Sequence, residues 1–285
     1  MQLWYYEDYE DGVKLGLATK EVLFRDKSDF QTVDVIETEH YGRMLLLDGL
    51  VMTTDKDEFV YHELISHVPA LNHKKPERVV VIGGGDGGTV RELLKHPEIK
   101  EIVLCEIDGM VVEVCEKYFP EIAGGIRDPR VKLNIGDGIA YMEQHAANSL
   151  DLVIVDSTDP IGPGEGLFSG AFYKSVAKAL KDDGLMVCQS EGLWHPPAVL
   201  QRIHRNVSAG FGHVYPYIAS IPTYPKGTWS WTMASKKPIN IREFDNTRLK
   251  KIESQGKGLK YINEDLMTGV FALPNFFKAK LKSDK

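Results

Sequence analysis

The stretch VVVIGGGDGGTVREL, residues 79–93, passes from an apolar β-branched run through a glycine-rich turn into a segment of helical periodicity. Gly83, Gly85 and Gly88 satisfy the GxGxxG spacing, in the strand–turn–helix context that a nucleotide-binding loop requires. That spacing alone is a weak signal. The unusual feature is Asp86, a carboxylate in the part of the loop where a phosphate would lie.

Asp86 argues against a dinucleotide ligand. A pyrophosphate at the helix N-terminus would lie close to this carboxylate, and repulsion in a partly desolvated site is costly. A positively charged ligand group would be attracted instead. The alternative is that Asp86 only caps a helix that begins at Gly87.

Short apolar runs alternate with segments of helical periodicity on the C-terminal side of this loop. We expect strands over 78–84, 101–108, 131–137, 150–157 and 184–191, and helices over 89–96, 110–119, 140–146 and 171–180. This alternation predicts right-handed βαβ crossovers and a parallel sheet covered on both faces, an α/β fold. Ligands of such sheets bind at the carboxyl ends of the strands.

The two ends of the chain have different patterns of apolar and turn-forming residues. Residues 1–57 contain short runs rich in β-branched and aliphatic residues, separated by turn-forming stretches, which predict a small antiparallel β domain. A helix is expected over 58–71, where a catalytic domain of residues 58–285 begins. Near the C-terminus we expect strands over 213–221 and 228–236, followed by a helical, lysine-rich tail.

Carboxylates follow the second and third expected strands of the catalytic domain. Glu106 ends one strand at about the offset where a carboxylate accepts hydrogen bonds from ribose hydroxyls. Asp137, followed by Gly138, ends the next strand on the same sheet edge, where it is able to meet an adenine amino group. Together with the glycine loop they favour an adenosine-type ligand, whereas each one alone is also compatible with a solvated loop carboxylate.

A second acidic cluster follows the fourth strand. Asp156 and Asp159 lie three residues apart on a turn, where both can face one pocket and hold a cation or accept a proton. Their mutual repulsion would raise one pKa. Alternatively, Asp159 simply starts a turn with Pro160. Residues 160–170, rich in Gly and Pro, are either a lid over the site or only a connector.

Aromatic residues accompany these carboxylates. Tyr61, Trp194 and Tyr224 fall near helix or strand ends of the expected catalytic domain. An aromatic wall with acidic ends suits an aliphatic polyamine, because methylenes pack on rings and ammonium groups meet carboxylates. Taken singly, each aromatic is more often a core residue than a ligand contact.

Composition and charge limit the class of protein. The 285 residues carry a formal net charge of −7, which disfavours a nucleic-acid surface. The three cysteines form no CxxC pair, so reduced thiols and a cytoplasmic location are expected. The acidic N-terminus lacks the features of a signal peptide, and no apolar run approaches the ~18 residues of a membrane span.

Metal and nucleophile chemistry are disfavoured. His62 and His67 are five residues apart, so on a helix they would point roughly 140° away from each other and would not share a zinc ion. No GxSxG element is present, and the cysteines fall in strand or helix contexts that favour burial. We therefore expect no metal site.

Several motifs together resemble one family. The segments LLLDGLVMTTDKDEFVYHE, VIGGGDGGTVRE, CEID, GDG, VDSTDPIGPGEGLF, CQSE and IPTYPKG are similar, in order and over essentially the whole chain, to those of the polyamine aminopropyltransferases, specifically the spermidine synthases. The resemblance implies a small N-terminal β domain and a Rossmann-like, methyltransferase-type catalytic domain. It also implies aminopropyl transfer from decarboxylated S-adenosylmethionine, a cosubstrate rather than a permanent cofactor, to putrescine.

The resemblance assigns roles to individual residues. The nucleoside cosubstrate would be held by Gln31, His62, Gly83, Gly85, Asp86, Glu106, Ile107, Asp137 and Gly138. The diamine would be held by Tyr61, Asp156, Asp159, Gln189 and Tyr224, with Trp4 also reaching that site. Asp156 would be the general base. The family also implies a homodimer or homotetramer, whereas the charge and composition favour neither nucleic-acid nor membrane partners.

Two departures and three rival functions remain open. His62 is typical of bacterial members, whereas some relatives have glutamine there, and the segment QSEGLWHPP leaves the chain length of the acceptor open. A conventional methyltransferase would share the fold but leave Asp86 and the DSTD pair unexplained. An NAD-linked oxidoreductase is disfavoured by Asp86. A non-catalytic polyamine-binding protein would bind methylthioadenosine without turnover.

Overall fold

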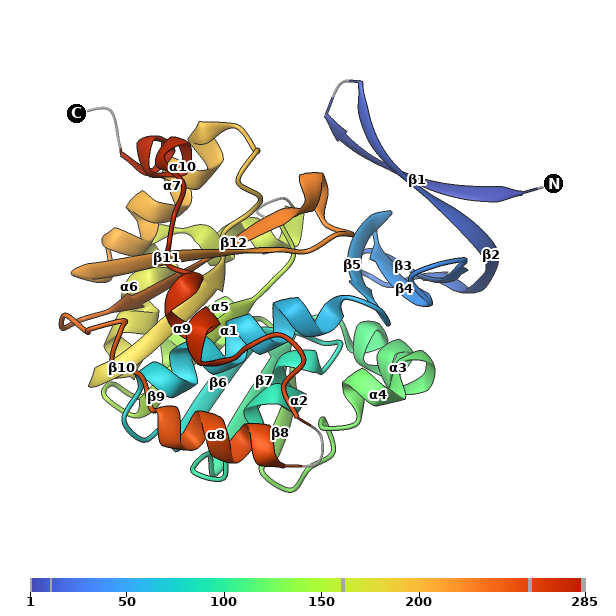
Figure 1. The fold of residues 1–285 in the computed structure, drawn as a ribbon. Coiled ribbons are helices and arrows are strands. Elements are labelled where there is room, and N and C mark those ends of the chain that lie inside the picture. Colours follow the sequence, from blue (N-terminus) through green and yellow to red (C-terminus); the bar gives the residue numbers. More distant parts are fainter. Residues whose placement is uncertain (1, 11, 160–161, 256–257, 283–285) are drawn as a thin grey trace.

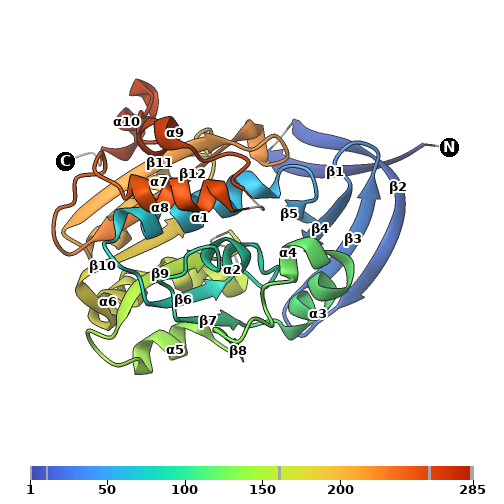
Figure 2. The same ribbon diagram turned by 60° about the horizontal axis from the view of Figure 1, so that its bottom comes forward.

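The computed structural model describes residues 2–10, 12–159, 162–255 and 258–282, and its strands form two separate sheets (Figure 1). The N-terminal sheet lies to one side of a larger α/β body, at the opposite end from the C-terminus. Figure 2 shows α1 and α8 on one face of the larger sheet, and α5 and α6 on the other. The α/β fold class is confirmed.

The N-terminal sheet is fully antiparallel, in the order β1-β2-β3-β4-β5. Its strands are β1 Leu3–Glu10, β2 Val13–Lys27, β3 Thr32–Thr38, β4 Arg43–Leu47 and β5 Leu50–Thr54. Asp48 and Gly49 join β4 to β5 with φ angles of 49° and 82°. Two successive positive φ angles are typical of a tight hairpin turn, and the sequence Asp-Gly favours them.

The larger sheet has the order β11-β12-β10-β9-β6-β7-β8. Its strands are β6 Arg78–Gly83, β7 Glu101–Glu106, β8 Val131–Ile135, β9 Leu150–Asp156, β10 Leu180–Gln189, β11 His213–Ser220 and β12 Thr228–Ser235. Strands β6 to β10 are parallel, whereas β12 and β11 add to the edge in antiparallel fashion. The parallel arrangement expected from the alternation of strands and helices therefore holds for β6 to β10.

Helices cover both faces of this sheet. They are α1 Glu58–Asn72, α2 Gly88–Leu93, α3 Gly109–Tyr118, α4 Pro120–Ala123, α5 Gly138–Gln144, α6 Gly170–Ala179, α7 Pro197–Ser208, α8 Asn246–Ser254, α9 Glu264–Gly269 and α10 Asn275–Leu281, with 3-10 helices η1 Gly162–Phe168 and η2 Pro225–Gly227. The sequence analysis did not anticipate α7. Its signal was present, because Leu200, Ile203 and Val207 follow Pro197 at helical spacing, and all three are buried.

The residues of β6 alternate between two hydrophobic clusters. Val79 and Val81 pack with residues of α1 to α4, whereas Val80 and Ile82 pack with residues of α5, α6 and α7. Because both faces are covered, the strand is a continuous apolar run without polar alternation. This two-sided burial is why the VVVI segment identifies the centre of the fold.

The chain reverses its direction across the sheet at β6. It proceeds outward from β6 through β7 to β8, then returns to β9 on the other side of β6. Such a switch point opens a crevice at the carboxyl ends of the two strands. There Gly83 of β6 is paired with Asp156 of β9.

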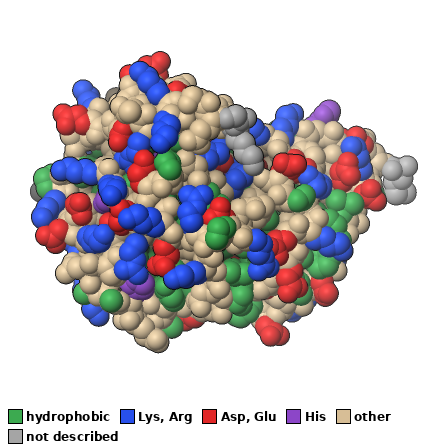
Figure 3. Space-filling model, turned by 90° about the horizontal axis from the view of Figure 1, so that it is seen from below, with side chains coloured by type: hydrophobic (Ala, Val, Ile, Leu, Met, Phe, Trp, Pro, Cys, Tyr) green, Lys and Arg blue, Asp and Glu red, His purple; other side chains and the backbone are tan. Residues whose placement is uncertain are grey.

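The surface mixes charges of both signs. Figure 3 shows acidic and basic side chains interspersed over one face, with hydrophobic side chains gathered toward the end that carries the N-terminal sheet. Among the described residues, no helix has both the length and the hydropathy to cross a membrane. Cys105, Cys115 and Cys188 are free thiols and are buried.

Helix α1 anchors the C-terminal segment through one buried carboxylate. Glu63 accepts hydrogen bonds from the backbone N–H groups of Lys260, Tyr261 and Ile262, at 2.7, 2.9 and 2.9 Å. Hydrogen bonds to a charged acceptor are stronger than neutral ones. Residues 260–262 belong to no helix or strand, and the Glu63 carboxylate accepts the hydrogen bonds that their backbone N–H groups would otherwise make there.

We expect Glu63→Ala to lower the free energy of unfolding by about 3 kcal/mol, because three backbone donors lose a charged acceptor. Glu63→Gln should lower it less, since its amide oxygen keeps one acceptor. Urea unfolding measures the stability, and amide hydrogen exchange at residues 260–262 should accelerate in the alanine variant. An unchanged midpoint with unchanged exchange would contradict this assignment.

Candidate active site

A large cavity lies at the carboxyl ends of β6, β7, β8 and β9. Its lining includes every residue expected to hold the nucleoside: Gln31, His62, Gly83, Gly85, Asp86, Glu106, Ile107, Asp137 and Gly138. Tyr61, Asp156 and Tyr224 also line it. The fold thus gathers three strand ends and the glycine loop around one space.

The glycine loop lies against the end of β9. Gly83 has a φ of +78°, and a Cβ on it would come within 2.2 Å of the Asp156 carbonyl oxygen. Only glycine allows both the positive φ and this approach. Further along the loop, the Gly85 N–H donates to Glu106 Oε2 at 3.1 Å, so the loop is also held by the end of β7.

Glu106 is a buried carboxyl with its two oxygens in use. Oε1 accepts from the Asp108 N–H at 2.9 Å, while Oε2 accepts from Gly85. Burial raises the pKa of Glu106 to about 7. Hydrogen bonds also hold two other residues expected at the nucleoside site. The Gln31 amide donates to Asp108 Oδ2 at 3.0 Å, and Asp137 Oδ1 accepts from the Ile139 N–H at 2.8 Å.

Asp86 both caps the helix and faces the cavity. Its Oδ1 accepts from the Gly88 N–H at 2.8 Å, as the capping alternative required. Its Oδ2 lies 3.2 Å from His62 Nε2. Capping is therefore not its whole role, because the same carboxylate takes part in an ion pair at the cavity wall.

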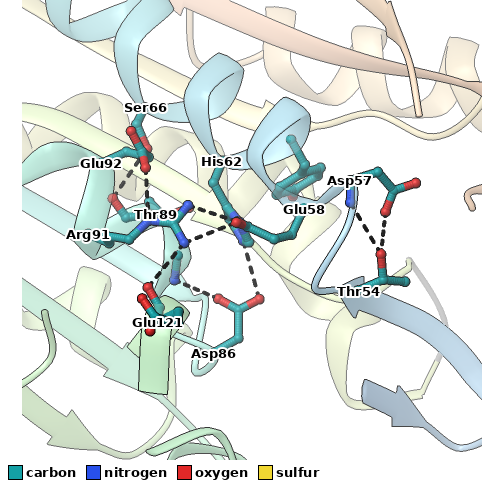
Figure 4. A network of polar contacts seen from close by, with 12 residues as sticks. Thr54, Asp57, Glu58, His62, Ser66, Asp86, Thr89, Arg91, Glu92 and Glu121 are labelled. Carbon is teal, nitrogen blue, oxygen red and sulfur yellow. Dashed lines mark hydrogen bonds and ion pairs between the residues drawn. The ribbon is translucent and has the colours of Figure 1, made fainter. Parts of the chain in front are cut away.

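His62 lies between two carboxylates (Figure 4). Its Nδ1 is 2.6 Å from Glu58 Oε2, and its Nε2 faces Asp86. A neutral imidazole has one N–H, so only the doubly protonated ring donates to both partners. Burial alone would lower the pKa of His62, but Asp86 and Glu58 outweigh it and raise the pKa to about 10.

The charge on His62 is balanced through a buried network. Arg91 donates to Glu58 at 2.8 and 3.1 Å and to Glu92 Oε1 at 2.9 Å (Figure 4). Glu92 Oε2 lies 2.9 Å from His67 Nε2. His62 and His67 thus contact separate carboxylates, which the sequence analysis did not anticipate.

Asp156 at the end of β9 has a donor on each oxygen. The Tyr61 hydroxyl donates to Oδ1 at 2.7 Å, and the Thr89 hydroxyl donates to Oδ2 at 2.6 Å. Burial, followed by repulsion from Asp86, raises the pKa of the Asp156 carboxyl above its ordinary value. A carboxylate of raised basicity, facing the cavity, is suited to accept a proton.

A second, smaller cavity adjoins the first. Both are lined by Met52, Tyr61, Ser157, Thr158 and Tyr224, and the smaller one adds Glu7, Asp159, Gln189 and Trp229. Aromatic rings form one wall, with ring centroids 5.8 Å apart for Tyr61 and Tyr224, and 4.9 Å apart for Tyr224 and Trp229. The smaller cavity is thus a channel with aromatic rings on one wall and the carboxyl groups of Glu7 and Asp159 in its lining.

Glu7 is a lining residue that the sequence analysis missed. It lies on β1, is 5% exposed, and its Oε2 accepts from the Val51 N–H at 3.0 Å and the Tyr5 hydroxyl at 3.2 Å. The segment LWYYEDYE was not recognised as a strand, because it lacks the aliphatic runs of the neighbouring strands. Burial, with a smaller contribution from Asp159, raises the pKa of Glu7 to about 7.

Two tryptophans considered for the site lie elsewhere in the described structure. Trp4 is half-exposed on β1, stacks on Tyr6 and lines neither cavity. Trp194 is also half-exposed and stacks on Phe276 of α10. Within this chain the aromatic wall is completed by Trp229, which the sequence analysis placed on a strand without a role.

The expected lid is only partly described. Residues 160 and 161 lie outside the described residues, and η1 covers most of the remainder. Gly164 and Leu167 of this segment line the large cavity. The segment therefore borders the site, and its movement as a lid stays a prediction.

Two family models together match most of the chain, from residue 3 to residue 245. One described as a spermine/spermidine synthase domain matches residues 58–245, and one described as a spermidine synthase tetramerisation domain matches residues 3–55. A polyamine aminopropyltransferase from Thermoanaerobacter pseudethanolicus is 45% identical over 282 residues, 98% of each chain. One of the same name from Bacillus subtilis is 41% identical over 283 residues, 99% of each chain.

Solved structures agree with these sequence matches. A crystal structure of spermidine synthase in complex with the transition-state analogue AdoDATO superposes with a TM-score of 0.93 at 41% identity, covering 98% of this chain and 94% of that one. The spermidine synthase from Thermotoga maritima superposes with a TM-score of 0.92 at 40% identity, with the same coverage.

We expect Glu7→Gln to stabilise the ligand-free protein at about pH 8, but not below about pH 4.5. The folded-state pKa is raised from 4.5 to about 7, so ionising this buried carboxyl costs folding free energy as the pH rises through that window. Thermal unfolding at both pH values measures the difference between variant and wild type. Glu21→Gln on the exposed part of β2 is the control, and an equal difference at both pH values would refute the expectation.

Proposed function

Because the chain belongs to the spermine/spermidine synthase family, we propose that it transfers the aminopropyl group of decarboxylated S-adenosylmethionine to putrescine, giving spermidine and 5′-methylthioadenosine. It is thus a polyamine aminopropyltransferase. One observation carries the choice of substrates. The large cavity, with Asp86 and Asp156 on its wall, adjoins a channel lined by aromatic rings and by the carboxyl groups of Glu7 and Asp159.

The nucleoside cosubstrate would lie in the large cavity. Glu106 would accept hydrogen bonds from the ribose hydroxyls, and Asp137 would lie near the adenine, each at the end of its strand. Asp86 would hold the aminopropyl ammonium group. The ordinary, non-decarboxylated cosubstrate would bring a carboxylate to the same region, where Asp86 would repel it.

The diamine would lie in the adjoining channel. Tyr61 and Tyr224 would pack against its methylene groups, and Asp159 and Gln189 would bind its distal amine. Glu7 adds a second carboxyl group to that end of the channel. A diamine ion with two separated positive charges therefore matches both the shape and the charge of the space.

The chemistry requires a base and a positioned nucleophile. An alkylamine such as putrescine has a pKa of about 10 and is almost fully protonated at neutral pH. Asp156 would take one proton from the attacking amine, whose lone pair then forms the new N–C bond. The C–S bond of the sulfonium breaks at the same carbon, and its electron pair stays on sulfur as a neutral thioether. Proximity in the joined cavities would supply much of the rate.

Assembly and location are also proposed. The chain would form a homodimer or homotetramer through its N-terminal sheet, which supports association by exposing the side chains of Leu3, Trp4 and Tyr6. We keep 1–57 and 58–285 as its two domains. The three buried free cysteines are compatible with a cytoplasmic protein.

We expect purified protein to convert putrescine and decarboxylated S-adenosylmethionine to spermidine and 5′-methylthioadenosine. Chromatography of the products with a panel of diamines measures the acceptor range directly. Replacing the cosubstrate with S-adenosylmethionine tests for methyl transfer in the same assay. A methylated product, or no product with any diamine, would show that the proposed function is wrong.

We expect Asp156→Asn to lower kcat by about 10²- to 10⁴-fold, the range for loss of a general base. Asparagine preserves the size of the side chain but is not able to take the proton. The affinity for 5′-methylthioadenosine, measured by calorimetry, should change little because the nucleoside contacts remain. Turnover close to that of wild type would remove Asp156 from the role of base.

A further inference from the structure

Thr89, which the sequence analysis gave no role, connects the glycine loop to the proposed base, Asp156. Thr89, in the first turn of α2, is fully buried and donates its hydroxyl hydrogen to Asp156 Oδ2 at 2.6 Å. The Tyr61 hydroxyl, from α1, donates to the other oxygen. Two donors from different helices therefore hold the carboxylate at the end of β9.

We propose that Thr89 is a positioning residue for aminopropyl transfer, whose hydroxyl orients the Asp156 carboxylate toward the attacking amine. The inference rests on the proposed function, in which Asp156 is the base. Thr89 is not among the residues that line either cavity, so it acts through Asp156 and not by touching the substrates.

The geometry leaves Thr89 few other partners. A threonine inside a helix commonly bonds to the carbonyl of the preceding turn, but Thr89 is the second residue of α2 and has no helical turn before it. Its own carbonyl accepts from the Ser66 hydroxyl at 3.2 Å, which fixes the backbone on the α1 side. The hydroxyl is thus directed at Asp156 by the backbone of the loop.

The loop also closes around the same carboxylate oxygen. A Cβ on Gly84 would lie 2.8 Å from Asp156 Oδ2, so the loop backbone packs directly against that oxygen. Little room is left for a water molecule to replace the threonine hydroxyl. Each carboxylate oxygen has two lone pairs, so one hydroxyl on each restricts rotation of the group and leaves a lone pair on each for an amine.

The Thr89 hydroxyl also counteracts the groups that raise the pKa of Asp156. Burial and Asp86 favour the protonated form of Asp156, whereas His62, Thr89 and Tyr61 favour the carboxylate. Tyr224 is the further titratable group that interacts with it. Removing only the Thr89 hydroxyl therefore shifts the balance toward the protonated acid, which is not able to take a proton from the amine.

Thr89 also connects the proposed site of the cosubstrate with the proposed site of the acceptor. Asp86, which we propose to hold the aminopropyl ammonium group, is three residues earlier in the same loop. The segment DGGT thus positions a carboxylate for the cosubstrate and a hydroxyl for the base of the acceptor site. Because this segment is short, it fixes the positions of the Asp86 carboxylate and the Thr89 hydroxyl relative to each other.

The test is Thr89→Val, which replaces the hydroxyl with a methyl group of similar size. We expect kcat/KM for putrescine to fall roughly 10-fold, the effect of one lost hydrogen bond to a charged group. The acidic limb of its pH profile should move to higher pH relative to wild type. The affinity for 5′-methylthioadenosine should not change. Thr89→Ser, which keeps the hydroxyl, should restore the wild-type profile.

Matched variants separate this effect from a structural one. Thr53→Val removes a buried hydroxyl that has no hydrogen-bond partner in the described structure, and should leave the pH profile unchanged. Thr89→Ala is a second variant without the donor and should show the same shift if valine disturbs folding. A Thr89→Val profile that coincides with wild type, or a Thr89→Ser variant as impaired as Thr89→Val, would overturn the proposal.

The outcome also distinguishes this inference from the function on which it rests. If Asp156→Asn retains normal turnover, the assignment of the base is wrong and the role of Thr89 falls with it. If Asp156→Asn loses activity but both donor-less variants behave as wild type, only the positioning role of Thr89 is wrong.

Discussion

The close approach of Gly83 to the carbonyl of Asp156 is the constraint on which the active site depends. The two residues are paired at the ends of β6 and β9, where the order of the strands reverses. Any side chain at Gly83 would collide with that carbonyl. The approach brings Asp86 of the glycine loop to the same cavity wall as the proposed base, and Thr89 behind it within hydrogen-bonding distance of that base.

Charge compensation makes this wall stable. Asp86 repels the nearby carboxylate of Asp156 and, after burial, is the main influence that raises the pKa of Asp156. His62, doubly protonated between Asp86 and Glu58, supplies a fixed positive charge, and Arg91 balances Glu58 in turn. The enzyme can therefore present carboxylates to cationic substrates without an uncompensated buried charge behind them.

Much of the fold and of the site was predictable from local patterns. The glycine loop, Glu106, Asp137 and Asp156 each follow an apolar strand, and parallel strands bring such residues to one edge. Strand β1 was missed because its segment lacks the aliphatic runs of the neighbouring strands, and the burial of Glu7 depends on its contact with Val51 of β5. Trp194 was expected near the substrates, but it stacks on Phe276, a partner more than eighty residues away.

The amino-acid sequence by itself determined the class of fold, the glycine loop and the ligand class that Asp86 favours, since these follow from periodicity, spacing and charge within short segments. Only the tertiary structure decided the charge on His62, the donors to Asp156 and the composition of the second cavity. Each of these depends on atoms from segments far apart in the chain. Glu7, Tyr61 and Asp159 meet only because the N-terminal sheet, α1 and the end of β9 pack around one space.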